Sequence, residues 1–161
     1  MVNNDWGIDH GVWSVLSNMY PDADVPVVMV SVNRNLTPLE QFEIGKRLEP
    51  LRGDGALIIG SGNIVHNLGM VDWRMDDGYD WAYKFDSDIK STILKGDFEK
   101  IVNYNDLEFS ELAIPTPDHF YPLLNILGAV SKEEDVRREL SFCSDLTISS
   151  YKDIYNWVSK S

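Results

Sequence analysis

The chain has 161 residues, of which 43% are hydrophobic and 11% aromatic, so we expect one globular core and a single domain over residues 1–161. A formal net charge of −12 argues against a nucleic-acid partner, because no overall positive field attracts phosphate groups. No apolar run reaches the roughly 20 residues that span a bilayer, and the first residues lack an export signal, so the sequence predicts a cytoplasmic protein with no membrane partner.

The first predicted elements form a strand, helix, strand unit. Residues 25–33 (VPVVMVSVN) are a β-branched apolar run that is typical of a buried strand. Thr37 as N-cap, Pro38 at the first helical position and Glu40 as the capping-box acid predict that a helix begins there. A second buried strand is expected over residues 56–59 (ALII).

This unit favours an α/β fold with a mostly parallel central sheet flanked by helices, because a helix that joins two parallel strands makes a right-handed crossover. We predict that Val27–Val30 and Ala56–Ile59 are neighbouring or near-neighbouring buried strands. Apolar side chains recur every four residues over Tyr79–Lys95 and predict an amphipathic helix. A short buried helix is expected over Phe120–Val130 and a last strand over Leu140–Ser149.

Three histidines are the best candidates for acid/base chemistry or metal ligation near neutral pH. His10, His66 and His119 each stand in a predicted loop with glycine or proline nearby, and His66 follows a predicted strand, where α/β folds gather binding groups. A single histidine is more often a capping or surface residue. Three histidines in such settings are less easily explained in that way.

The GSGNIVHN stretch after the second predicted strand offers an alternative function. Gly60 and Gly62 match the first two glycines of the dinucleotide-binding turn, which would make the protein bind NAD. Val65 stands where the third glycine belongs, and a bulky residue there obstructs the close helix packing that the turn requires. A dinucleotide-binding protein is therefore the less favoured hypothesis.

Three long segments resemble, in order, the class III extradiol ring-cleavage dioxygenases of the LigB superfamily, in their DOPA-dioxygenase-like branch. They are GIDHGVWSVLSNMYPDADVPVVMVSVN, PLRGDGALIIGSGNIVHNLG and IPTPDHFYPLLNILGAV. The resemblance extends from about Trp6 to about Tyr151, because SFCSDLTISSY also looks like the final strand of that family. The order and spacing of the matches make this resemblance far more specific than the two-glycine motif.

The resemblance implies an enzyme that opens the ring of a small aromatic diol beside one hydroxyl with O₂, at a non-haem Fe(II) site that zinc can also occupy. It implies that His119 is a metal ligand and that His66 is either a further metal ligand or the base that takes a catechol proton. His10 would contact the substrate or O₂ without holding the metal. On this resemblance we predict that the three histidines converge in one cleft, and their shared settings agree with it. Imidazole suits both roles, since it binds iron and zinc and titrates near neutral pH.

The sequence departs from this family at its beginning. Family members start with a strand and a Ser-His-Gly loop, and a second histidine segment follows; these two histidines supply the remaining metal ligands. Met1 lies only nine residues before His10, so the chain resembles roughly the last three fifths of such an enzyme. We therefore expect an incomplete site, completed by a separately encoded N-terminal half or a homo-oligomer. The alternatives are a truncation of a longer enzyme and a non-catalytic remnant that serves as a binding or structural module.

Overall fold

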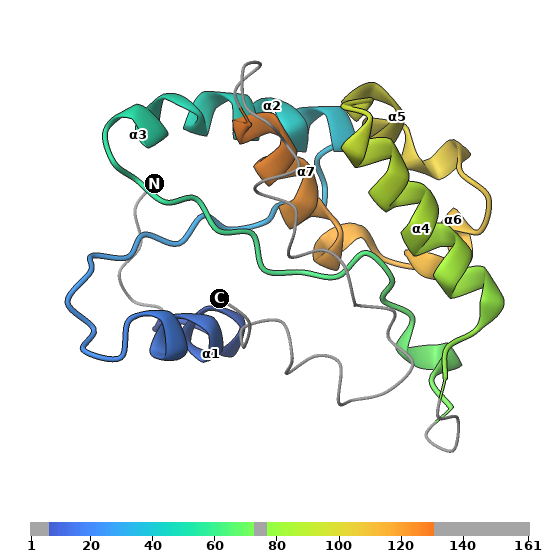
Figure 1. Ribbon diagram of the computed structural model, residues 1–161, viewed down its shortest axis with the longest axis horizontal. Helices are drawn as coiled ribbons and strands as arrows, with labels where there is room; N and C mark the ends of the chain where they lie inside the picture. The colour runs from blue at the N-terminus through green and yellow to red at the C-terminus, as the bar shows by residue number, and fades with distance from the viewer. Residues whose placement is uncertain (1–6, 73–76, 131–161) are drawn as a thin grey trace.

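The computed structural model describes residues 7–72 and 77–130, and its regular structure there is helical (Figure 1). The longer helices are α1 (His10–Met19), α2 (Pro38–Leu48), α4 (Asp80–Leu94) and α7 (Tyr121–Ala129). Three short α-helices are α3 (Pro50–Gly53), α5 (Phe98–Val102) and α6 (Ser110–Ala113). Single 3₁₀ turns cover Leu68–Met70, Tyr104–Asp106 and Pro117–His119.

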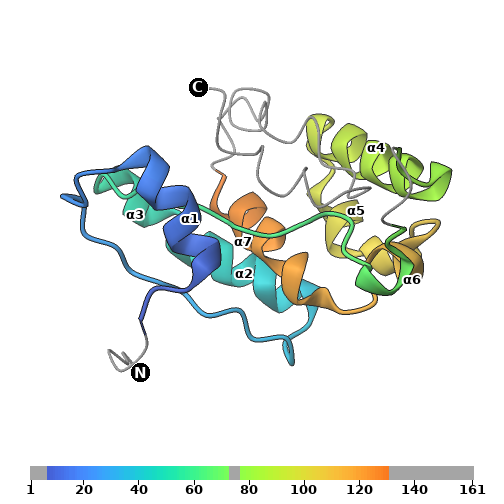
Figure 2. The same ribbon diagram turned by 90° about the horizontal axis from the view of Figure 1, so that it is seen from below.

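The predicted mostly parallel central sheet was wrong for the described part of the chain, which contains no strand. Val27–Val30 and Ala56–Ile59 run without regular structure, and most of their side chains are exposed. The two stretches overlap in Figure 1 but separate in Figure 2, where residues 56–66 cross the centre and residues 21–35 follow the lower edge. Two strands alone are marginally stable in water, and the described residues offer neither stretch a third strand to pair with.

The predicted helices are confirmed, because their signals are local. Thr37 caps α2: its hydroxyl accepts from the Glu40 amide at 3.2 Å, while the Glu40 carboxylate accepts from the Thr37 amide at 2.7 Å. The helix predicted over Tyr79–Lys95 is observed as α4. The helix predicted over Phe120–Val130 is observed as α7, one residue shorter at each end.

The core lies where α7 packs between α2 and the α4–α5 pair (Figure 1). Two glycines let α2 and α7 approach closely, because a Cβ on Gly45 would stand 2.0 Å from the Asn125 carbonyl oxygen and one on Gly128 would stand 2.1 Å from that of Phe42. The largest fully buried apolar side chains are those of Phe85, Phe120, Ile89, Ile93, Ile101, Leu124, Leu127 and Val65. Burial of these side chains is what stabilises the helices in water.

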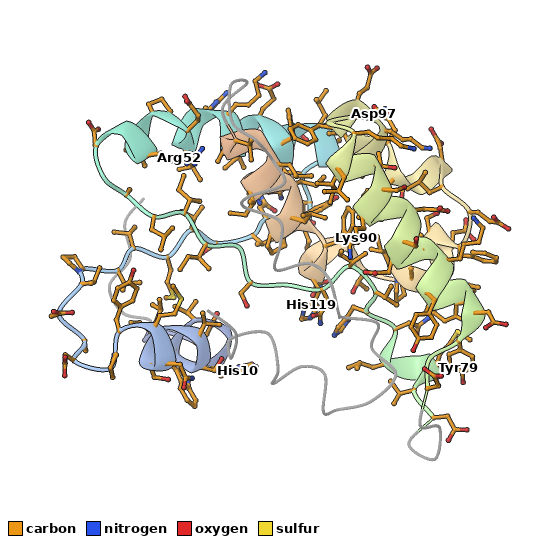
Figure 3. The ribbon with its side chains drawn as sticks, viewed as in Figure 1. His10, Arg52, Tyr79, Lys90, Asp97 and His119 are labelled. Atoms are coloured by element: carbon orange, nitrogen blue, oxygen red, sulfur yellow. The ribbon has the colours of Figure 1, made fainter. Side chains whose placement is uncertain are left out.

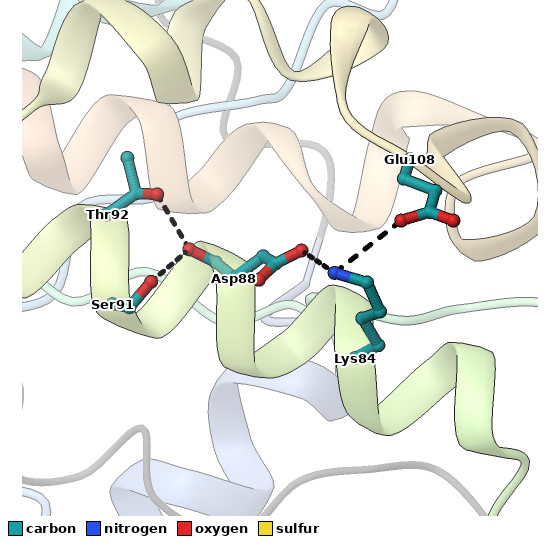
Figure 4. Close-up of polar contacts among 5 residues, drawn as sticks. All are labelled: Lys84, Asp88, Ser91, Thr92 and Glu108. Carbon is teal, nitrogen blue, oxygen red and sulfur yellow. Dashed lines mark hydrogen bonds and ion pairs between the residues drawn. The ribbon is translucent and has the colours of Figure 1, made fainter.

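The ion pairs of α4 lie at the surface, and two hydroxyls bond to the backbone of the same helix (Figure 4). The Lys84 ammonium stands 2.9 Å from the Asp88 carboxylate and 3.5 Å from that of Glu108, and the hydroxyls of Ser91 and Thr92 donate to the Asp88 carbonyl. Exposed ion pairs of this kind contribute at most about 1 kcal/mol. The position of α4 therefore depends on its buried face.

Some predictions lie outside the described residues. The last strand over Leu140–Ser149 is one of them, and the single domain over residues 1–161 stays a prediction for the same reason. Within residues 7–72 and 77–130, no helix has the length and apolar character needed to cross a membrane.

Candidate functional site

Two of the three histidines are held by buried neighbours in the chain. Val65, which precedes His66, is 2% exposed, and Phe120, which follows His119, is 1% exposed and packs on the Tyr104 ring with centroids 4.5 Å apart. The Tyr121 hydroxyl also donates to the Leu36 carbonyl at 2.9 Å. These anchors in the core fix the backbone at residues 66 and 119, while the histidine side chains stay partly exposed.

His66 and His119 lie face to face, although 53 residues separate them in the chain. Their ring centroids are 3.7 Å apart and their planes differ by 18°. Two backbone bonds hold this arrangement: the His66 amide donates to the Ala113 carbonyl at 2.8 Å, and the Asn63 amide donates to the His119 carbonyl at 2.8 Å. The structure therefore brings these two predicted site residues together.

The pKa of His66 is lowered from its ordinary value of 6.5. Partial burial is the larger cause, because it disfavours the charged imidazolium, and the neighbouring His119 acts in the same direction. The Asp118 carboxylate opposes both effects. His66 is therefore held in the neutral form, which can accept a proton or donate a lone pair to a metal ion.

Asp118 is a site residue that the sequence prediction missed. Its Oδ2 lies 3.6 Å from Nε2 of His119, whereas its buried Oδ1 has no hydrogen-bond partner among the described residues. The Thr116 hydroxyl is the main cause that lowers the pKa of Asp118, so the carboxylate stays ionised at neutral pH. The signal in the sequence was the pairing of a carboxylate with a histidine in the PTPDH stretch.

His10 is exposed and begins α1, where Asp9 caps the helix by accepting from the Val12 amide at 3.0 Å. The loop expected around His10 is therefore a helix start. Figure 3 shows His10 at the end of α1 that lies nearer to His119, with the two residues apart. The Ser61 hydroxyl donates to the Gly11 carbonyl at 3.3 Å and so links this helix to the segment that leads to His66. The convergence of all three imidazoles in one cleft stays a prediction.

Histidine is a suitable ligand for iron or zinc, but two histidines are fewer ligands than such a site commonly uses. A non-haem iron site commonly uses two histidines and a carboxylate whose lone pairs meet at one point. In two nearly parallel rings the in-plane lone pairs do not converge. Among the described residues there is no group of three histidine, cysteine, aspartate or glutamate side chains placed to hold a metal ion. The described residues thus form at most part of such a site.

Comparisons with known proteins agree with the resemblance seen in the sequence. Residues 1–152 match the family described as the catalytic LigB subunit of aromatic ring-opening dioxygenase. A crystal structure of an uncharacterized protein from Escherichia coli K12 is similar to this chain with a TM-score of 0.74 and 41% sequence identity. That similarity covers 80% of this chain and 55% of the crystallised one.

Curated relatives carry names that describe their reaction. The chain is 43% identical to an Escherichia coli protein named 4,5-DOPA dioxygenase extradiol, over 81% of this chain and 50% of the relative. It is 38% identical to the protein of the same name from Beta vulgaris, over 78% of this chain and 47% of the relative. The chain thus spans about half the length of the curated relatives it matches.

Proposed function

Since this chain belongs to the LigB family of catalytic subunits of aromatic ring-opening dioxygenases, we propose that it contributes part of an extradiol dioxygenase site. The reaction would be the opening of a catechol-type ring beside one hydroxyl with O₂. Fe(II) would be the cofactor, with zinc as an alternative occupant. The catechol, the O₂ chemistry and the metal are all part of this proposal, as is the activity of the whole protein.

The observation that supports the proposal is the stacked histidine pair. His66 and His119 come from two segments far apart in the sequence and lie 3.7 Å apart between ring centroids, in a chain whose relatives are named extradiol dioxygenases. We propose His119 as a metal ligand and His66 as either a further ligand or the base that takes a catechol proton. If both are ligands of one ion, the two rings must turn out of their nearly parallel stack. Because the described residues offer only two such imidazoles side by side, the remaining ligands would come from outside residues 7–72 and 77–130.

In the second of these roles, His66 would be the base for the substrate and would not bind the metal, because a neutral imidazole has a single available lone pair. A catechol that binds through both oxygens must lose a phenolic proton, and a ring nitrogen of a neutral imidazole can accept it. The lowered pKa keeps His66 neutral at neutral pH, so its lone pair is available. In this role His66 accepts the proton, whereas His10 contacts the substrate or O₂.

The chain spans about half the length of its curated relatives, so we propose that a second polypeptide supplies the remaining ligands. A separately encoded N-terminal half would bring the missing histidines, and a second copy of this chain is the other candidate partner. The alternative is a non-catalytic remnant that serves as a binding or structural module. The two hypotheses differ in whether any added polypeptide restores iron binding and ring cleavage.

Anaerobic reconstitution tests the proposal. The 161-residue chain is loaded with Fe(II) alone and again with a polypeptide that covers the part of the family outside this chain, and O₂ consumption is recorded with DOPA as the probe. We expect little activity from the chain alone, because too few ligands leave the ion largely hydrated. The complex should be active and lose most of its activity in H66A or H119A.

Four outcomes discriminate among the hypotheses. In the complex, H10A should keep its iron content while turnover slows, because a residue that orients the substrate does not hold the ion. Robust O₂ consumption by the chain alone at stoichiometric iron would show that the site is not incomplete. Failure of every candidate half to restore activity would favour the remnant, and a thermal shift with NAD(H) would revive the dinucleotide hypothesis.

A further inference from the structure

The glycine-rich segment 60–63 runs against the start of α7. A Cβ on Gly62 would stand 2.2 Å from the His119 carbonyl oxygen, and the next residue, Asn63, donates its amide to that same oxygen at 2.8 Å. A Cβ on Gly60 would stand 2.6 Å from Cγ1 of Ile126 and 2.9 Å from the Pro122 carbonyl oxygen. Both glycines therefore permit a close approach between two backbones.

We infer that Gly62, supported by Gly60, is a positioning residue for the His66 and His119 pair. The Asn63 amide donates to the His119 carbonyl. His66, three residues further along the chain, stacks its ring on that of His119. Real Cβ atoms do not approach a carbonyl oxygen to 2.2 Å, so a side chain at position 62 must push the two backbones apart. The distance between the His66 and His119 rings then changes as the two backbones separate.

The requirement for glycine at position 62 comes from contact and not from backbone conformation. Among the described residues, the glycines with a left-handed φ are Gly55 and Gly96, so alanine at position 62 is compatible with the local backbone. The same contact accounts for the two-glycine motif without a bound nucleotide. The two glycines of this motif are therefore explained by their close packing against α7 and His119.

The neighbouring Ser61 extends this arrangement to the third histidine segment. Its hydroxyl donates to the Gly11 carbonyl, next to His10, and it contributes nothing to the bond between residues 63 and 119. The segment 60–63 therefore contacts the chain beside His10 and the chain at His119. The catalytic importance of this positioning rests on the proposed function, whereas the geometry itself does not.

The test is the nuclear magnetic resonance spectrum of the imidazole C–H groups in the full chain at about pH 8.5, two units above the ordinary histidine pKa. In the stacked pair each ring lies over the face of the other, so ring currents displace the His66 and His119 signals. We expect G62A to keep its helical circular dichroism and to lose this displacement. G53A is the matched control, since a Cβ there meets nothing within 4 Å, and S61A is the control within the same segment.

Retention of the displaced signals in folded G62A would overturn the inference, as would their loss in G53A or S61A. If G62A does not fold, amide exchange in the unmodified chain decides: slow exchange at Asn63 supports the inference and rapid exchange overturns it. Activity of the reconstituted complex separates this inference from the proposed function. An inactive complex together with a G62A-sensitive pair rejects only the function, and an active complex with an unchanged pair in G62A rejects only the positioning.

Discussion

His66 combines two influences that disfavour its positive charge. Burial removes part of its hydration, and the stacked His119 ring leaves no room for water on one face. The Asp118 carboxylate raises the pKa of His66, but this effect is smaller than those of burial and of His119. The balance keeps the imidazole neutral at a pH where an exposed histidine would already be partly protonated.

Titration of the His66 signals should therefore give a pKa below 6.5. Replacement of His119 by glutamine should raise that pKa without fully restoring the ordinary value, because burial is the larger cause and remains. Magnetic resonance titration of both proteins measures the difference. A His66 pKa above 6.5 in the unmodified chain, or one unaffected by H119Q, would contradict this account.

The lowered pKa also predicts how stability depends on pH. Between the folded pKa of His66 and its unfolded value of 6.5, the unfolded chain binds more protons, so the free energy of unfolding rises with pH. This contribution is complete above pH 6.5 and is lost as the pH falls through the folded pKa. Urea unfolding of the unmodified chain and of H66Q across this range should differ in slope, with the weaker dependence in H66Q.

Sequence patterns identified individual residues of the candidate site but not their arrangement in space. The histidine segments could be recognised from their neighbours in the chain, such as PTPDH before Phe120. The stacking of His66 on His119 could not, because it depends on a backbone contact between residues 63 and 119 that no local pattern encodes. The PTPDH stretch shows Asp118 next to His119, but the burial of one carboxylate oxygen of Asp118 is evident only in the fold.

At the scale of elements, the start of α2 shows what local signals can predict. Thr37, Pro38 and Glu40 form a capping box with proline at the first turn, and the structure has the same arrangement. These bonds join residues at most three positions apart, so the sequence alone specifies them. Strand pairing is different, because each strand needs partners whose identity the strand itself does not contain.

Removal of the cap at Thr37 should lower the free energy of unfolding by about 1 kcal/mol, because the amide of Glu40 loses its acceptor. Urea unfolding of T37A at neutral pH measures this loss. T37S is the matched control and should stay close to the unmodified chain, since serine caps helices as well as threonine does. Equal losses in the two variants would show that the methyl group, and not the cap, matters at this position.

The crossing of α2 and α7 should tolerate no side chain at its two glycines. In G128A the new Cβ would lie 2.1 Å from the Phe42 carbonyl oxygen, so the helices must separate and the core between them loosens. Such overpacking typically costs about 1–3 kcal/mol. In G53A, where the surroundings are open, stability should be unchanged or rise by up to about 1 kcal/mol. Similar urea midpoints for the two variants would contradict the close approach.

At the scale of the whole molecule, some apolar residues are buried in the core and others are exposed to solvent. The helices bury their apolar faces together, whereas residues 21–35 are exposed throughout despite the VPVVMVSVN run. Val28 is 87% exposed and Leu57 is 64% exposed. The sequence predicted both stretches as buried strands, which was wrong, because burial in a sheet requires neighbouring strands that the described residues do not supply.

This exposed apolar surface should make the chain associate with itself in solution, because extended stretches with unpaired backbone groups tend to pair with another chain. Sedimentation velocity over a range of concentrations measures the association. L57K should weaken it, since a charged side chain on such a stretch opposes pairing, while stability changes by no more than about 0.5 kcal/mol.

L39K is the matched control, because Leu39 is a leucine of similar exposure, 56%, that belongs to α2 and to neither stretch. Association that falls in L57K but not in L39K would place the contact on the extended stretches, and equal effects would assign it to general surface hydrophobicity. If a polypeptide with the remaining family segment completes the site, it should cover the same stretches. Its addition to the unmodified chain should then suppress self-association in step with the appearance of ring-cleaving activity.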